Sequence, residues 1–171
     1  MVRHPLARQV SNFFFLASSC QKNADKCEER LIPTLNLGSM SDEEKMDAFH
    51  EWILKVYKTY PPDTANHYRF GAAGHGNEVY DTFSSTQTSW LVDPEGEMVV
   101  KEIFHLEDLS KDITKLAEHI TCLKSGPLEM DHSNKTPNYP DYMLFAKNKQ
   151  TRSIINEVFA EDFKILGYKP V

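Results

Sequence analysis

The amino-acid sequence predicts an α/β fold, because strand-like stretches alternate with amphipathic helices. Met1–Val2 has the character of a strand end, and Pro5 follows where a first helical turn tolerates proline. Further along, residues 88–92 and 98–104 have the composition of two strands, and residues 93–97 have that of a hairpin turn between them. Strands at both places, separated by helices, are typical of this fold class.

Four segments show the apolar periodicity of helices. The second begins with a capping box, in which Ser41 is followed three residues later by Glu44, and the last is terminated by Gly167. The predicted helices cover residues 7–20, 41–60, 106–123 and 150–166. The predicted loops cover residues 21–40, 63–86 and 124–148.

Composition and charge narrow the function classes. The chain has 171 residues, about one domain by length, so we expect a single domain over residues 1–171. Its net charge of −6 argues against a general nucleic-acid-binding surface. The longest apolar run, Phe13–Ala17, is far too short to cross a membrane. No signal peptide is recognisable, so the chain as it stands is expected to be cytoplasmic.

The cysteines do not predict a metal site. The count of three is odd and no Cys-x-x-Cys pair is present, which argues against a four-thiolate site or a disulfide framework. Cys20 and Cys27 are either thiols or, in an oxidising compartment, a disulfide.

The sharpest motif lies at the start of the chain. Arg3 stands at the predicted strand end, and Ser11 follows eight positions later in the predicted helix. A guanidinium offers a planar fork to phosphate oxygens, and a helix N-terminus favours an anion at the same place. Arg8 adds local positive charge or pairs with an acid, and no acidic residue occurs before Asp25. These residues predict an anion site.

The stretch from Val2 to Ser11 resembles the 3′-phosphate motif of the sulfotransferase superfamily, whose members use 3′-phosphoadenosine 5′-phosphosulfate (PAPS) as sulfuryl donor. The resemblance implies that Arg3 and Ser11 hold the 3′-phosphate of PAPS or of adenosine 3′,5′-bisphosphate. It also implies a three-layer sandwich of the P-loop nucleotide-kinase-like type. Further stretches resemble the Golgi-type carbohydrate sulfotransferases in the same order along the chain: Phe49–Ile53, Asn66–Tyr68, Trp90–Leu109, His132–Tyr142 and Thr151–Tyr168.

One departure from the family concerns the loop that binds the 5′-phosphosulfate. Only Phe70–Gly76 is rich enough in glycine, and it has neither a strand before it nor a basic residue soon after it. We therefore expect the sandwich to be incomplete at its N-terminus. Relatives of this type are often held in the Golgi lumen by an N-terminal anchor, and the same compartment is expected if the parent gene encodes one.

The resemblance implies sulfuryl transfer from PAPS to a hydroxyl of a carbohydrate or another small acceptor. His67 is then the candidate catalytic base, and Lys135 is a further candidate contact to the cofactor phosphates. The alternative is a nucleotide-binding fragment or scaffold that keeps the Arg3–Ser11 site without turnover. Kinase-like phosphoryl transfer is a weaker alternative, because neither a Walker loop nor magnesium ligands are visible.

Overall fold

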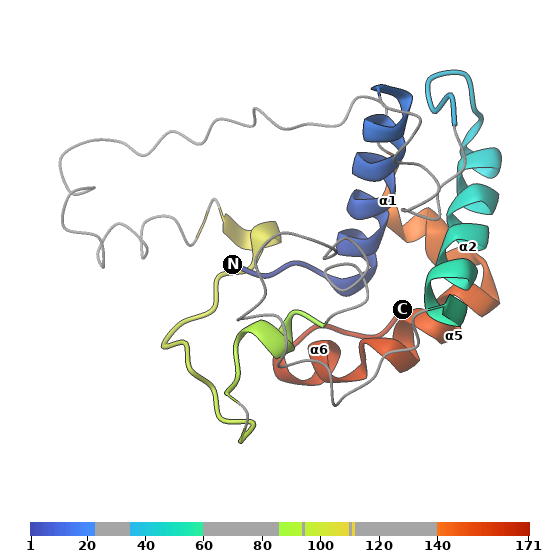
Figure 1. Cartoon of the computed structure of the whole chain (residues 1–171). Helices are drawn as coiled ribbons and strands as arrows, with labels where there is room; N and C mark the ends of the chain where they lie inside the picture. Colours follow the sequence, from blue (N-terminus) through green and yellow to red (C-terminus); the bar gives the residue numbers. More distant parts are fainter. Residues whose placement is uncertain (23–34, 60–85, 94, 110, 112–139) are drawn as a thin grey trace, which may run out of the picture.

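The structure of the chain, a computed structural model, describes residues 1–22, 35–59, 86–93, 95–109, 111 and 140–171 (Figure 1). Within these ranges the chain is mainly helical. The α-helices are α1 (Pro5–Lys22), α2 (Asp42–Thr59), α5 (Lys149–Val158) and α6 (Ala160–Ile165). Short 3₁₀ helices are η3 (Thr88–Trp90), η4 (Leu106–Asp108) and η6 (Tyr142–Lys147).

The first two helices run antiparallel, side by side, and share one hydrophobic core with η6, α5 and α6 (Figure 1). Aromatic rings dominate it. The ring of Phe13 lies 5.6 Å from that of Trp52, and the ring of Phe49 lies 5.0 Å from that of Phe145. Such tilted and edge-on pairs add to the stabilisation from burial alone. The core therefore holds α1 firmly against the rest of the described chain.

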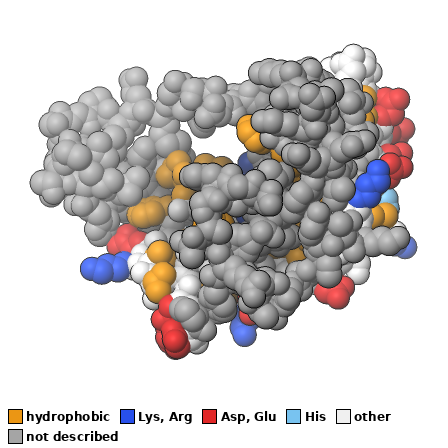
Figure 2. Space-filling model, viewed as in Figure 1, with side chains coloured by type: hydrophobic (Ala, Val, Ile, Leu, Met, Phe, Trp, Pro, Cys, Tyr) orange, Lys and Arg blue, Asp and Glu red, His pale blue; other side chains and the backbone are white. Residues whose placement is uncertain are grey.

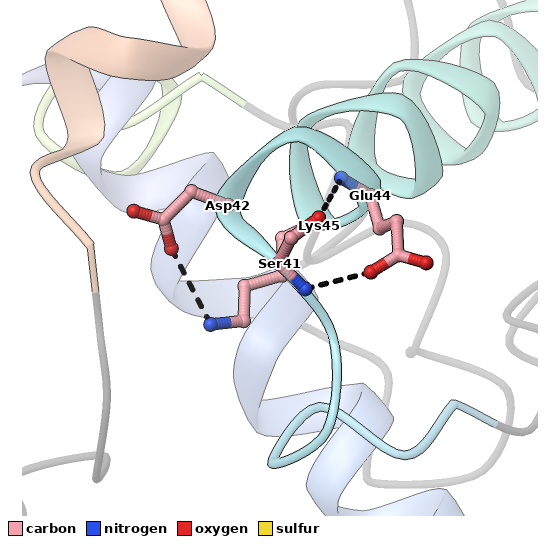
Figure 3. Close-up of polar contacts among 4 residues, drawn as sticks. All are labelled: Ser41, Asp42, Glu44 and Lys45. Atoms are coloured by element: carbon pink, nitrogen blue, oxygen red, sulfur yellow. Dashed lines mark hydrogen bonds and ion pairs between the residues drawn. The ribbon is translucent and has the colours of Figure 1, made fainter.

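The predicted capping box at the start of α2 is confirmed (Figure 3). The backbone N–H of Ser41 donates to Oε2 of Glu44 at 2.7 Å, and the N–H of Glu44 donates to Oγ of Ser41 at 3.2 Å. The pKa of Glu44 is lowered, mainly because its carboxylate accepts the backbone N–H of Ser41. Lys45 pairs with Asp42 at 3.4 Å beside the box. The helix thus begins where its sequence predicts.

The predicted α/β fold, a P-loop nucleotide-kinase-like three-layer sandwich, is wrong for the described residues. They contain no strand and no sheet, only two isolated bridges. Val2 bridges His105 in parallel, and Val92 bridges Met98 in antiparallel. The hairpin turn is present, since the N–H of Asp93 donates to the carbonyl of Glu97 and Gly96 has a positive φ of 88°. The turn therefore forms without extended strands beside it.

The first predicted strand of that hairpin is replaced by η3, for a local reason. The backbone N–H of Ser89 donates to Oγ1 of Thr86 at 3.2 Å, and Oγ of Ser89 donates to the carbonyl of Thr86 at 2.7 Å. Such side-chain bonds to nearby backbone compete with a β-ladder. The second predicted strand begins with exposed Met98 and Val99, so it has no buried face to stabilise a sheet there.

The last predicted helix is two helices. Phe159, at φ −104° and ψ 25°, separates α5 from α6 and is itself fully buried. The break turns both Phe159 and Asp162 into the protein interior. The predicted terminator is confirmed, because Gly167 has a φ of 74° directly after the end of α6.

Two other predicted segments differ from the structure where it describes them. The predicted loop 124–148 contains η6, whose Phe145 and Ala146 are buried in the core. The predicted helix 106–123 begins with a single 3₁₀ turn, η4, and its residues 112–123 lie outside the described residues. Cys20 is a buried thiol in the core, and Cys27 lies outside the described residues.

Candidate functional site

The segment ahead of α1 is anchored by backbone bonds. The N–H of Val2 donates to the carbonyl of Phe104 at 2.8 Å, and the N–H of Leu106 donates to the carbonyl of Val2 at 2.8 Å. Three residues after Val2, α1 begins at Pro5, whose fixed φ suits the first helical position. Arg3 thus lies between a bridge and a helix N-terminus. The predicted strand end at Met1–Val2 is reduced to this isolated bridge.

Arg3 is held at its backbone by the side chain of Gln87. The N–H of Arg3 donates to Oε1 of Gln87 at 2.9 Å, and Nε2 of Gln87 donates to the carbonyl of Arg3 at 2.6 Å. Gln87 is held in turn by α6, because its own N–H and that of Thr88 donate to the two carboxylate oxygens of Asp162, at 2.9 and 2.8 Å. Three segments far apart in sequence therefore meet at Arg3.

Arg8 is placed beside the same buried carboxylate. Burial lowers the pKa of the Arg8 guanidinium, while the nearby Asp162 carboxylate raises it. Tyr57 of α2 completes this group, and burial raises the pKa of its hydroxyl. Because Asp162 is fully buried, its charge needs the cation and the two N–H donors around it. Asp162 is thus an acid that acts on Arg8 electrostatically, and the choice between the two roles considered for Arg8 stays a prediction.

His4 lies in a cage of aromatic rings. Its ring centroid is 5.1 Å from that of Tyr142, 5.4 Å from that of Tyr168 and 5.6 Å from that of Phe163. Nε2 lies 3.3 Å from the carbonyl of Lys169, so it carries the proton and donates. Nδ1 has no hydrogen-bond partner among the described residues. Burial is the main reason that the pKa of His4 is lowered.

Glu107 joins the C-terminal segment to this cage. One carboxylate oxygen accepts the N–H of His4 at 2.7 Å, and the other accepts the hydroxyl of Tyr168 at 2.9 Å. The pKa of Tyr168 is raised, first by burial and then by this carboxylate. His105 packs on Tyr168 at 5.0 Å and donates from Nε2 to the carbonyl of Leu166 at 2.8 Å. The residues after α6 are thereby tied to both sides of the N-terminal bridge.

Stability should depend on pH through His4. Its pKa in the folded chain is below the ordinary 6.5, so the unfolded chain binds the proton more readily. The contribution of His4 to the free energy of unfolding should therefore be fully present above pH 6.5. It should decrease as the pH falls from 6.5 toward the lowered pKa of His4 in the folded chain. Urea unfolding between pH 8 and 5.5 measures this.

The variants His4→Phe and His4→Gln supply the control, because neither side chain titrates. Both should flatten the pH dependence over that interval, even where their absolute stability is lower than that of the original chain. An unchanged slope in both variants would show that other groups cause the dependence.

Ser11 lies on the more accessible face of α1. Arg8, Ser11, Asn12 and Phe15 follow the helical spacing of three and four residues, and all are partly or fully exposed, whereas Phe13 and Phe14 are buried. At 1.5 Å per residue, Ser11 lies about 9 Å along the axis from Pro5. Its hydroxyl is thus on the helix that begins beside Arg3, one to two turns in.

Two other predicted site residues, His67 and Lys135, lie outside the described residues. The residues that sequence reasoning missed are Gln87, Asp162 and Glu107. Asp162 had a recognisable signal, since it follows Phe159 by three positions and precedes Phe163 on an otherwise apolar helix face. The other two carry no comparable signal, because their partners are at least 61 residues away in sequence.

The surface and the comparisons add little on function. On the face in Figure 2, described acidic and basic side chains are interspersed without a continuous basic patch. No helix in the described ranges is long and apolar enough to span a membrane. Where the structure describes the chain, no three metal-ligating side chains are grouped. No family model, curated protein or solved structure matched the sequence.

Proposed function

We propose that this chain binds the 3′-phosphate of an adenosine nucleotide and serves sulfuryl transfer from PAPS to a hydroxyl of a carbohydrate or other small acceptor. The observation that carries the proposal is the placement of Arg3 directly before α1, with Ser11 on the accessible face of that helix. The first turn of α1 contains no acidic residue of its own, and the carboxylate placed next to it is that of Glu107, which accepts the N–H of His4 at 2.7 Å.

The residues at this place suit a phosphate dianion. Arg3 can present two parallel N–H donors to two phosphate oxygens, and Ser11 can donate a hydroxyl. The positive end of the α1 dipole favours an anion at the same place. Arg8, in the first turn of the same helix, adds positive charge close enough to act electrostatically on Asp162.

Transfer itself needs more than anion binding. A base must accept the proton of the acceptor hydroxyl, and donors must stabilise charge on the transferring group. His67 is the proposed base and Lys135 a proposed additional cation; both belong to the motifs that resemble the sulfotransferases. The described residues bear on nucleotide binding, which is the first part of the proposal, and not on the transfer step.

Thermal unfolding with and without adenosine 3′,5′-bisphosphate tests the binding. Ligand at a hundred times its dissociation constant should stabilise the chain by about 2.7 kcal/mol. For a chain of this size that is a rise in Tm of about 5–10 °C. Arg3→Ala should weaken binding by about 10- to 100-fold, since one charge-assisted bond contributes about 1.5–3 kcal/mol.

Matched controls come from α5, where Arg152 and Ser153 are adjacent and exposed. Arg152→Ala and Ser153→Ala should keep the full rise in Tm, whereas Arg3→Ala and Ser11→Ala should reduce it. No rise in the folded original chain would contradict the proposal. If the chain binds the nucleotide but transfers no labelled sulfate to a panel of carbohydrate acceptors, it is the non-catalytic nucleotide-binding alternative.

A further inference from the structure

Gln87 makes a two-point contact with the main chain of Arg3. Its amide accepts the N–H of Arg3 at 2.9 Å and donates to the carbonyl of Arg3 at 2.6 Å. The two bonds hold the main chain of Arg3 at its N–H and at its carbonyl, on either side of its Cα. A single residue held at both its donor and its acceptor cannot rotate its peptide planes without breaking one of the bonds. The direction in which the Arg3 side chain leaves the backbone is therefore set by Gln87.

Gln87, whose two bonds to the main chain of Arg3 form a clamp, is itself held by α6. Asp162 accepts the N–H of Gln87 at 2.9 Å and that of Thr88 at 2.8 Å, one on each carboxylate oxygen. Asp162 is fully buried, and its carboxylate acts electrostatically on Arg8. Hydrogen bonds to an ionised, buried acceptor are among the stronger ones in proteins. The contact chain thus runs from the core at Asp162, through Gln87, to the backbone of Arg3.

We infer that Gln87 is a positioning residue for the 3′-phosphate, which orients Arg3 through its backbone and does not touch the nucleotide. The inference rests on the proposed function. Its physical basis is preorganisation: a bidentate guanidinium contact needs its fork held within about 0.5 Å and 10–20° of the productive geometry. Without the clamp, part of the binding free energy is spent on ordering Arg3 when the ligand arrives.

The distinguishing measurement is a ratio of two affinities, obtained by calorimetry. Adenosine 3′,5′-bisphosphate and adenosine 5′-phosphate differ only in the group that Arg3 would bind. Gln87→Met keeps the unbranched chain and removes both polar atoms, while its backbone bond to Asp162 remains available. We expect this variant to bind the bisphosphate about tenfold more weakly and the monophosphate unchanged within about twofold. A general loss of stability would instead weaken the binding of both ligands by a similar factor.

Two controls isolate the effect. Gln150→Met makes the same change at an exposed position in α5 and should leave both affinities unchanged. In an Arg3→Ala background, Gln87→Met should have little further effect on bisphosphate binding, because the two residues act through one contact. If Gln87→Met does not fold, Gln87→Glu serves instead, since it keeps an acceptor for the Arg3 N–H and loses the donor to the Arg3 carbonyl.

The outcomes separate the inference from the proposed function. If the original chain prefers the bisphosphate and the Gln87 variant keeps that preference, the positioning role is overturned and the nucleotide site stands. If the original chain shows no preference for the bisphosphate, the proposed 3′-phosphate site is overturned, and the positioning role with it. A preference that is present in the original chain and lost in the variant supports both.

Discussion

Replacing Phe14 by alanine should lower the free energy of unfolding by about 3–5 kcal/mol, the usual cost of removing a buried phenylalanine ring. Its side chain is 1% exposed and its ring lies 6.1 Å from that of Phe145, in an edge-on arrangement. Removing it leaves a cavity between α1 and η6 that the surrounding rings cannot fill without leaving their own positions. Urea unfolding followed by circular dichroism measures the loss.

The next residue is a matched control. Phe15 has the same side chain in the same helix, but it is 65% exposed. Phe15→Ala should change the free energy of unfolding by no more than about 0.5 kcal/mol, as for most surface substitutions. If the two variants lose similar stability, the orientation of α1 described above is incorrect. Since α1 carries Ser11 and begins beside Arg3, the same loss of packing should also reduce nucleotide binding.

The second large effect is expected at Asp162. Asp162→Ala removes the acceptor of two backbone N–H groups and leaves the Arg8 guanidinium beside it without that carboxylate. Leaving a buried N–H group without its acceptor costs about 1–3 kcal/mol, and two such groups lose their acceptor here. Asp162→Asn should cost less, because its amide oxygen still accepts one of the two N–H groups. Urea unfolding at neutral pH compares the two variants.

Glu161 provides the comparison for Asp162, since it is the preceding residue of α6 and is exposed. Glu161→Ala should leave the free energy of unfolding unchanged within about 0.5 kcal/mol. Equal losses at the two positions would mean that the Asp162 carboxylate is not the buried anchor of η3. A selective loss at Asp162 would establish the anchor on which the position of Gln87 depends.

Local signals in the sequence were sufficient to predict the two long helices of the core, α1 and α2, whereas η6 and the break between α5 and α6 were not predicted. The apolar spacing of α1 and α2, the capping box at Ser41 and the terminator at Gly167 all depend on residues within a few positions of one another. The placement of Arg3 shortly before the first helix could be predicted for the same reason, although the predicted helix begins at residue 7 and α1 begins at Pro5. Short-range hydrogen bonds and helical periodicity can be recognised in the sequence directly, because the residues that make them are only a few positions apart.

Among the described residues, the absence of a sheet depends on local and tertiary contacts together, and the anchoring of Arg3 depends on tertiary contacts. Residues 88–92 have strand-like composition, yet the distant Asp162 carboxylate and a local Thr86 hydroxyl take the N–H groups at the start of η3. The break at Phe159 similarly depends on burying two side chains on the same side. Sequence composition expresses average preferences, whereas a buried carboxylate requires specific donors wherever the fold supplies them. That requirement joins Asp162, Gln87 and Arg3 across three distant segments of the chain.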